Sequence, residues 1–478
     1  MRTIATPAGS DRRTGPVGKQ PKDPSVGTPQ VPAPQPGPSL EAFLILGIAL
    51  TVGMALTFYR DPGPFWAWGV SLAVYLGVGA TSPQFRPGIR RMSAAIWVPW
   101  LGLMLLVLVP WAILAVGPTV GTLPSLPGWP AINAALLMSC MAYAALAVGV
   151  GGTPAPRSPR TARTALLDEK HLVVMLFALA YAGAVLKLMS QGGLHSYLAG
   201  DPVSAAAQSQ DDASVLGVLG TFLPMLGPAA GMLAWRRWKC VLSLRLIPLL
   251  VLAILPVTTM SYNRAAWVFP LVISAVVVVR FHPRAALPLF AAGIILLPAG
   301  ILAVGTFRDA TQARYLGIEM VDAESTGPLG DLQVYGAAPQ FVAFAVAADP
   351  DVPTLAQSIL SPVPKLGTQF REESGVAAYN RSIYAEDVAD QILPLSAEIY
   401  WLGGLPALLV GYFVVGLGIR AASRFAVRDP ADPVRLFLGL QASLYLTLSL
   451  FWSAAVVAQL LIYAWFVPFI TMRTLRVA

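Results

Sequence analysis

Charged residues are scarce in this chain of 478 residues, of which Asp, Glu, Lys and Arg together make up only 12%. A soluble domain usually carries about 25% charged residues. Hydrophobic residues account for 56% of the sequence, and the mean hydropathy is +0.66. This composition excludes a soluble globular protein and predicts a protein that crosses a membrane several times.

Cysteine and histidine are also rare. Cys140 lies in an apolar run and Cys240 in a basic loop, so the sequence predicts no disulfide. The three histidines, His171, His195 and His282, are scattered and form neither an HExxH zinc motif nor a haem ligand pair. We therefore predict no metal and no cofactor.

A net charge of +8 and a pI near 9.6 would fit a nucleic-acid-binding protein only if the basic residues gathered on one soluble face. They are instead distributed over short segments between apolar runs. Nucleic acid is therefore not expected as a partner, whereas the lipid bilayer is.

Twelve apolar runs have about the length, roughly 20 residues, that a helix needs to cross the hydrocarbon core. They do not alternate with the period of two of a barrel strand, so helices must span. The sequence predicts an all-α polytopic membrane protein with about 12 transmembrane helices. The runs are 40–58, 65–81, 94–117, 131–151, 171–189, 214–234, 244–260, 265–279, 287–305, 396–419, 436–451 and 454–471.

The Lys and Arg residues predict the orientation, because cytoplasmic loops carry an excess of them. With the N-terminus inside, all but eight of the 32 basic residues fall on the cytoplasmic side of one alternating topology. Both termini are then cytoplasmic. The outer eight are Arg60, Lys187, Arg264, Arg308, Arg314, Lys365, Arg371 and Arg381.

This topology divides the chain into four parts. Residues 1–39, which hold nine prolines, are expected to be a disordered cytoplasmic tail. Residues 40–305 contain transmembrane helices 1–9, and residues 396–478 contain helices 10–12. Between them, residues 306–395 form one large extracytoplasmic loop.

Loops as long as residues 306–395 are usually functional. Within this loop, residues 329–348 and 354–360 have helical apolar spacing, and proline-containing turns separate them. We therefore expect a cap of amphipathic helices that lies on the outer membrane surface.

The interiors of the expected spans contain almost no ionisable residues. Proton-coupled pumps and ion exchangers need carboxylates or histidines near the middle of the bilayer. A transporter is therefore the less favoured interpretation, and we expect the chemistry at the outer membrane surface.

Cationic candidates stand at the outer ends of helices and in the loop. Arg264 ends the link between the seventh and eighth spans, and Arg308 and Arg314 follow the ninth. Lys365 and Arg371 follow a turn stiffened by two prolines. Each could bind a pyrophosphate, which arginine does bidentately, or could be an ordinary solvated or snorkelling cation.

An acidic candidate lies where the loop returns to the membrane, in residues 393–404. Glu398 can accept a hydroxyl proton as a general base, although the first turn of a helix favours a carboxylate in any protein. Tyr400 and Trp401 fit an interfacial aromatic belt.

These motifs resemble those of the O-antigen polymerase family, which polymerises bacterial oligosaccharide repeat units. The shared features are an arginine before a span, one large outer loop, the Pro-Val-Pro-Lys turn of residues 362–365 and the Glu-x-Tyr-x-x-Gly-Gly return of residues 398–404. The resemblance covers about residues 258–418. The link here reads Tyr262-Asn263-Arg264, where relatives have a Ser-Arg-Gly form.

The resemblance implies a glycosyltransferase of the bacterial plasma membrane that polymerises polyprenyl-pyrophosphate-linked repeat units at the outer face, for O-antigen, capsule or exopolysaccharide. Donor and acceptor are both lipid-linked glycans, and a chain-length regulator and a flippase are the implied protein partners. The similarity carries over Arg264, Arg308, Lys365 and Glu398. We expect Glu398 and Arg264 to be catalytic, and Arg308, Arg314, Lys365, Arg371 and Tyr400 to bind substrate.

Other interpretations stay open. An O-antigen ligase-like transferase would use the same donor with a different acceptor, although residues 306–395 contain no histidine of the kind expected in its large loop. A transporter of a lipid-linked or anionic solute would use the outer arginines as a binding vestibule. A non-catalytic assembly partner would tolerate replacement of Arg264 or Glu398.

Overall fold

The computed structural model describes most of the expected spans and part of the cap. The described residues are 65–81, 94–109, 128–151, 169–190, 215–238, 246–258, 264–285, 287, 289, 338–347, 355–363, 367–371, 373–384, 393–429 and 432–476. The expected tail at 1–39 and the expected span at 40–58 lie outside these residues, as does nearly all of the span at 287–305.

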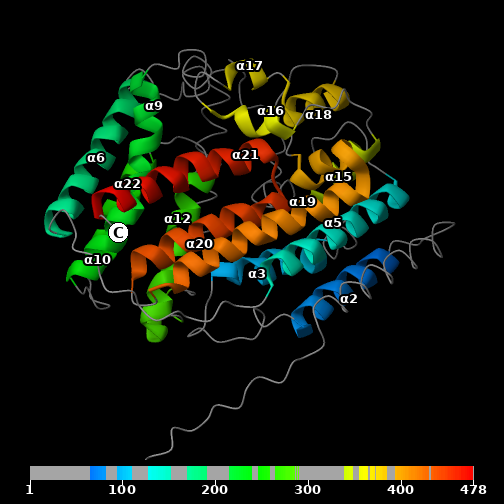
Figure 1. The fold of residues 1–478 in the computed structure, drawn as a ribbon, viewed down its shortest axis with the longest axis horizontal. Helices are drawn as coiled ribbons and strands as arrows, with labels where there is room; N and C mark the ends of the chain where they lie inside the picture. Colours follow the sequence, from blue (N-terminus) through cyan, green and yellow to red (C-terminus); the bar gives the residue numbers. More distant parts are fainter. Residues whose placement is uncertain are drawn as a thin grey trace, which may run out of the picture. The chain divides into compact units, whose positions relative to one another are not determined.

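All regular structure in these ranges is helical, and the ranges contain no strand (Figure 1). Two of the elements, η4 and η8, are π-helical turns. The elements are α2 (Phe65–Thr81), η3 (Ala94–Ile96), α3 (Trp97–Leu103), η4 (Met104–Leu108), α5 (Trp129–Val150), α6 (Glu169–Ser190), α9 (Val215–Phe222), η5 (Leu223–Met225), α10 (Leu226–Trp238), α11 (Leu246–Thr258), α12 (Arg264–Phe281), η6 (Pro283–Ala285), α15 (Ala338–Ala347), α16 (Leu355–Leu360), α17 (Thr368–Arg371), α18 (Gly375–Tyr384), α19 (Leu395–Val427), α20 (Pro433–Thr447), η7 (Leu448–Leu450), α21 (Ala454–Gln459), η8 (Leu460–Phe466) and α22 (Val467–Arg476).

Among the described residues, 6 helical stretches are long and apolar enough to cross a membrane. The all-helical class is therefore confirmed, and these stretches support a polytopic membrane protein. The number of twelve spans and the sidedness of the loops and termini stay predictions. The stretches are Trp129–Val150, Glu169–Ser190, Gly217–Trp238, Leu395–Val427, Pro433–Leu450 and Ala454–Thr474.

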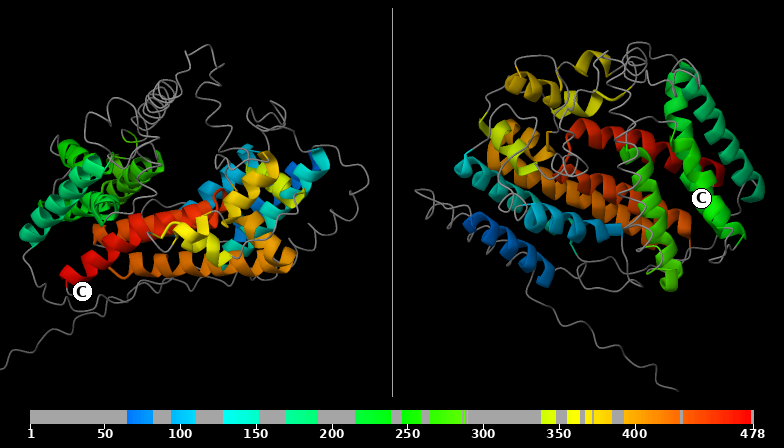
Figure 2. Two further views of the ribbon diagram at one scale, coloured as in Figure 1. Left: turned by 90° about the horizontal axis from the view of Figure 1, so that it is seen from above. Right: turned by 180° about the vertical axis from the view of Figure 1, so that it is seen from behind.

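Helices α5 and α19 lie side by side along much of their length (Figure 2). A Cβ atom on Gly416 would overlap the carbonyl oxygen of Leu146 and lie 2.8 Å from the Gly149 Cα. Only glycine allows the two backbones to come this close. Two residues after Gly149, Gly151 lies next to the guanidinium of Arg420, so the two helices run in the same direction.

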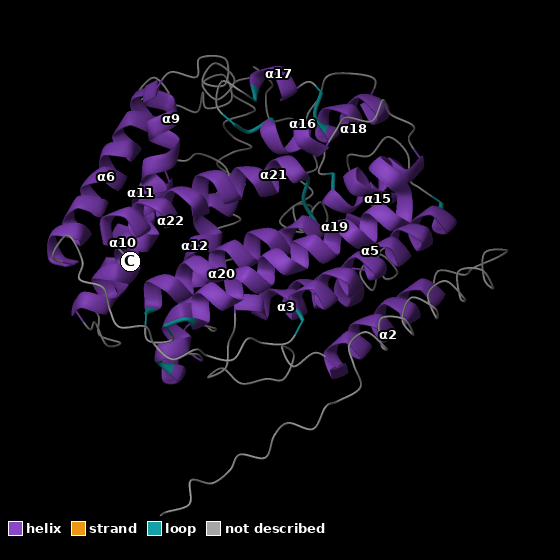
Figure 3. Cartoon of the chain, in the orientation of Figure 1, coloured by secondary structure: helices purple, strands orange, loops and turns teal. Residues whose placement is uncertain are grey.

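The helices described within residues 306–395, named the cap helices here, are α15 to α18, and none is longer than 10 residues (Figure 3). Helix α15 packs against α5 and α19, and α16 packs against α21. The Trp401 Nε1 donates a hydrogen bond to the Ala345 carbonyl at 2.7 Å, and the Tyr463 hydroxyl donates to the Pro362 carbonyl. Side chains of the apolar helices thus hold the cap through its backbone.

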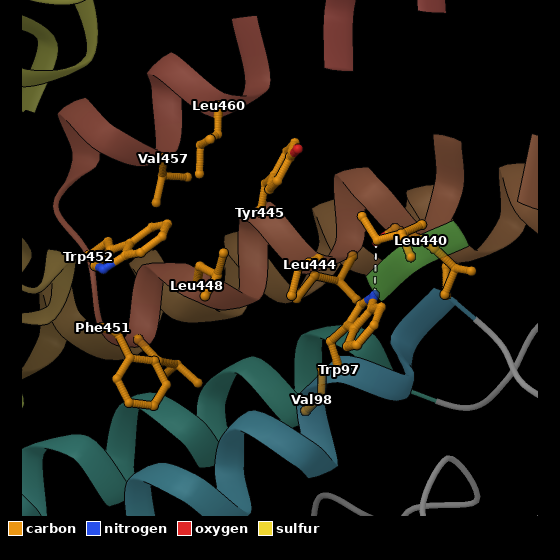
Figure 4. Packing of buried hydrophobic residues seen from close by; sticks show 14 of the residues in the cluster. Trp97, Val98, Leu440, Leu444, Tyr445, Leu448, Phe451, Trp452, Val457 and Leu460 are labelled. Carbon is orange, nitrogen blue, oxygen red and sulfur yellow. Dashed lines mark hydrogen bonds between the residues drawn. The ribbon is translucent and has the colours of Figure 1, made fainter. Parts of the chain in front are cut away.

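Helix α20 lies at the centre of the buried core, because it contacts α19, α10, α12 and η3. Trp97 places its ring against this helix and donates from Nε1 to the Leu440 carbonyl at 2.9 Å (Figure 4). The Phe269 ring of α12 also packs here, with its centroid 6.2 Å from that of Tyr445 in α20 and 5.5 Å from that of Trp452. Helix α20 is buried on nearly all sides, since only Arg435 and Leu446 of its residues are partly exposed.

An ion-pair cluster joins the start of α6, the end of α10 and the start of α20. The Arg236 Nη1 lies 3.1 Å from Asp432 Oδ1, and the Arg435 Nε lies 3.5 Å from Asp432 Oδ2. Arg236 also pairs with Glu169. The alternating topology puts these three segments on the same, cytoplasmic side. Their contact agrees with that relative placement.

The glycine crossing gives the first prediction. Gly416→Ala should lower the free energy of unfolding by about 1–3 kcal/mol, because the new methyl group has no room beside α5. Thermal unfolding of the purified protein in detergent measures this loss.

The matched control is Gly69→Ala in α2, since nothing lies within 4 Å of a Cβ atom at that position. The control should keep or raise the melting temperature. Equal melting temperatures for Gly416→Ala and the wild type would contradict the close crossing.

The second prediction concerns Asp432, which is 4% exposed and also accepts a hydrogen bond from the Val434 amide at 3.0 Å. Asp432→Asn keeps this helix cap and removes the charge, whereas Asp432→Ala removes both. Both variants should unfold more easily, and Asp432→Ala should lose about 1 kcal/mol more. Chemical denaturation in detergent measures the loss of stability in each variant. Identical unfolding curves for the two variants would contradict the capping role.

Candidate functional site

The candidate site lies at the start of α19, where the helix is interrupted. Gly403 and Gly404 have non-helical dihedral angles, and the φ of Gly404 is 64°, which favours glycine. The interruption separates a first stretch, containing Glu398, Tyr400 and Trp401, from the long apolar remainder. The Gly-Gly pair of the sequence motif therefore sets the angle at which these side chains leave the apolar helix.

Glu398 is buried, with 4% of its surface exposed. Its Oε2 accepts a hydrogen bond of 2.6 Å from the Ala454 backbone amide, the first residue of α21. Glu398 also lies in the first turn of its own helix. The carboxylate therefore sits at two helix N-termini, where the partial positive charge stabilises an anion.

The cap contributes the other wall around this carboxylate. A Cβ atom on Gly375, the first residue of α18, would overlap Glu398 Oε1 and lie 3.0 Å from its Cδ. The Gly375 amide donates to the Ser358 hydroxyl at 2.9 Å, and that hydroxyl is close to the Glu398 carboxylate. The carboxylate thus meets α16 and α18 of the cap and α19 and α21 of the apolar helices.

The two oxygens of the Glu398 carboxylate differ in their hydrogen bonding. Among the residues that the structure describes, Glu398 Oε1 is buried and no donor meets hydrogen-bonding geometry to it, although the Ser358 hydroxyl is near. A buried carboxylate oxygen with spare acceptor capacity is costly, and such groups are concentrated at functional sites. Oxygen Oε1 is the atom that could accept a proton from a substrate hydroxyl.

The turn between α20 and α21 is held against the start of α19. The Leu395 amide donates to the Trp452 carbonyl at 2.9 Å, and the Ser453 hydroxyl caps α21 by accepting from the Val456 amide at 3.4 Å. The apolar runs expected at 436–451 and 454–471 leave only Trp452 and Ser453 between them, and the helices do break there. This link places the Ala454 amide within hydrogen-bonding distance of the Glu398 carboxylate.

Of the predicted site residues, the structure describes Glu398 and Tyr400 with their side chains, and the side chain of Tyr400 is partly exposed. Arg264 is the first residue of α12 and Arg371 the last of α17. The predicted substrate-binding residues Arg308, Arg314 and Lys365 lie outside the described residues. The convergence of the cations on Glu398 therefore stays a prediction.

The partners of Glu398 were not predicted from the sequence. Ser358, Gly375 and Ala454 come from three different segments, and their residue types are too common to stand out. One signal was present: Ser374-Gly375 and Ser453-Ala454 each begin a helix after a break, with serine as the capping residue. Among the described residues, no cluster of three His, Cys, Asp or Glu side chains could hold a metal ion.

The chain was compared with models of protein families, with curated proteins and with solved structures, and none of the three comparisons gives a match.

The third prediction tests the joint at Glu398. Glu398→Ala should lower the free energy of unfolding by about 1.5–3 kcal/mol, because it leaves the Ala454 amide without its charged partner. Glu398→Gln keeps an oxygen for that amide and should lose less. Thermal unfolding, with the rate of proteolysis within Gly375–Tyr384 as a local readout, measures both effects.

Arg381→Gln is the control, since Arg381 is an exposed cap residue in the same helix α18. Its unfolding and proteolysis should match the wild type. If Glu398→Ala behaved like Arg381→Gln, the carboxylate would not hold the cap.

Proposed function

We propose that this chain is a glycosyltransferase of the bacterial plasma membrane that polymerises polyprenyl-pyrophosphate-linked oligosaccharide repeat units at the outer face. The observation that carries the proposal is the buried Glu398 carboxylate at the meeting point of cap and apolar helices, whose Oε1 has no donor in hydrogen-bonding geometry among the described residues. The resemblance of residues 258–418 to the O-antigen polymerase family supports the same assignment.

The reaction requires one base and several cations. The acceptor hydroxyl oxygen attacks the anomeric carbon of the donor sugar while the bond from that carbon to the pyrophosphate oxygen breaks. Glu398 takes the hydroxyl proton, and the polyprenyl pyrophosphate leaves with the bonding electron pair. Positive charge develops on the sugar and negative charge on the leaving group, so fixed cations stabilise the transition state.

Arg264 is the proposed catalytic cation, because a guanidinium binds pyrophosphate oxygens bidentately. It stands at the first residue of α12, the end of that helix nearest the link from α11. Arg308, Arg314, Lys365 and Arg371 are the proposed further contacts to the phosphates, and Tyr400 the proposed contact to the sugar. The apolar helices supply the hydrophobic surroundings that a polyprenyl chain needs.

The burial of Glu398 sets a condition on this mechanism. With only 4% of its surface exposed, the carboxylate does not reach bulk solvent. Gly375 lies directly against Oε1. An acceptor hydroxyl therefore reaches this oxygen only when α18 moves aside. Opening of the cap at Gly375 is therefore part of the proposed cycle, and closure excludes the water that would otherwise hydrolyse the donor.

The fourth prediction is the direct test of this function. The purified full-length protein in detergent, given lipid-linked repeat units and no gradient, should produce a ladder of lengthened products. Glu398→Gln should slow the reaction about 100-fold or more, because a positioned general base contributes this much. Arg264→Gln should slow it similarly, and Arg264→Lys should retain part of the rate.

Arg381→Gln is again the control and should form the ladder at the wild-type rate. Melting temperatures of all variants separate a lost catalytic group from a misfolded protein. Absence of a ladder together with gradient-driven solute uptake would establish a transporter instead. In a deletion strain, lipid-linked polymer that accumulates beside an unmodified final acceptor would establish a ligase.

A further inference from the structure

The long apolar part of α19 presents one exposed face. Val410, Phe413, Val414 and Leu417 have 64%, 40%, 57% and 41% of their surface exposed. Their spacing of three and four residues puts them on one side of the helix. The opposite side, with Tyr412, Gly416 and Ile419, is buried against neighbouring helices.

Two arginines continue this face at its C-terminal end. Ala421, Arg424 and Arg428 are all exposed and follow Leu417 at intervals of four, three and four residues. The same exposed face of α19 is therefore apolar up to Ala421 and cationic at Arg424 and Arg428. Neighbouring positions one turn apart on a helix are about 5–6 Å apart between Cβ atoms, close enough for two guanidinium groups to bind one phosphate.

Arg424 and Arg428 differ in their partners from Arg236 and Arg435, the arginines of the ion-pair cluster at this end. Arg236 and Arg435 are paired with Asp432, and Glu169 is paired with Arg236. Within the part of the chain that the structure describes, Arg424 and Arg428 form no ion pair. The carboxylate nearest to them in sequence, Asp429, already has an interaction of its own.

We infer that this face of α19 is a binding site for an anionic phospholipid, with the phosphate held between Arg424 and Arg428 and an acyl chain lying along Ala421, Leu417 and Val414. The partner is a bilayer lipid of the leaflet at this end, whichever side of the membrane that is. The inference is independent of the proposed glycosyl transfer.

The length of this face of α19 matches the depth of one lipid leaflet. Val414 lies ten residues before Arg424, which corresponds to about 15 Å along the helix. Half of a hydrocarbon core of about 30 Å has the same depth. An acyl chain that starts at Arg424 therefore ends near Val414. Arginine also binds phosphate in a fixed bidentate geometry, so this contact selects a phosphate over a general negative surface potential.

The fifth prediction follows from this geometry. The delipidated full-length protein in detergent should gain thermal stability when phosphatidylglycerol is added, and should gain little from phosphatidylcholine. The double variant Arg424→Gln/Arg428→Gln should bind phosphatidylglycerol about tenfold to thirtyfold more weakly, by analogy with about 1 kcal/mol per basic residue at an anionic membrane. Native mass spectrometry counts the retained lipids directly.

The matched control is Arg237→Gln/Arg473→Gln, which removes the same charge from two other exposed arginines at the ends of α10 and α22. It should keep the phosphatidylglycerol shift. An unchanged shift in the Arg424/Arg428 double variant would overturn the site. Equal shifts with phosphatidylcholine, equal shifts with inorganic phosphate alone, or an equal loss in the control would each also overturn it. Melting temperatures without lipid show that each variant is folded.

Discussion

The hydrogen bond between the Glu398 carboxylate and the Ala454 amide is the contact on which the candidate site depends. Transfer of a carboxylate from water into a protein interior is strongly unfavourable unless hydrogen bonds and local charge offset it. Here a backbone amide and two helix N-termini supply that compensation. A Cβ atom at Gly375 would overlap the same carboxylate, so the cap fits closely against it. Electrostatics and packing thus fix one arrangement together.

A second buried carboxylate, at the other end of the apolar helices, is stabilised in the same way. Asp432 is as buried as Glu398 and likewise accepts a backbone amide hydrogen bond at a helix start. The two carboxylates differ in their remaining partners within the described chain, since Asp432 has two arginines whereas Glu398 Oε1 has only the nearby Ser358 hydroxyl, outside hydrogen-bonding geometry. That difference separates a group saturated with structural partners from one that retains capacity for chemistry.

Helix positions followed from the sequence where apolar runs had clear ends. The expected span at 65–81 coincides with α2. The run expected at 396–419 extends to Val427, because Arg420 and Arg424 are good helix formers although they end the apolar stretch. Hydropathy marks the limit of the lipid-facing part, whereas the helix itself continues until its backbone bonds end.

The site was only partly predictable for a physical reason. Glu398 and Tyr400 were found because they stand where the long loop returns to an apolar run, in the Glu-x-Tyr-x-x-Gly-Gly segment that carries the resemblance. Ser358, Gly375 and Ala454 act through a hydroxyl, a missing side chain and a backbone amide. Their importance arises from contacts between distant segments, which no local pattern contains. The close approach of Gly149 and Gly416 was unpredictable for the same reason, since glycines are common throughout the chain.

The interruption at Gly403 and Gly404 has a mechanical consequence. A continuous helix would transmit every tilt of its membrane portion to the stretch that carries Glu398. Because the backbone leaves helical geometry at this pair, the helix is divided there into a short and a long portion. A tilt of the long portion in response to bilayer thickness is therefore not transmitted along one unbroken helix to the short portion, which is bonded to Ala454.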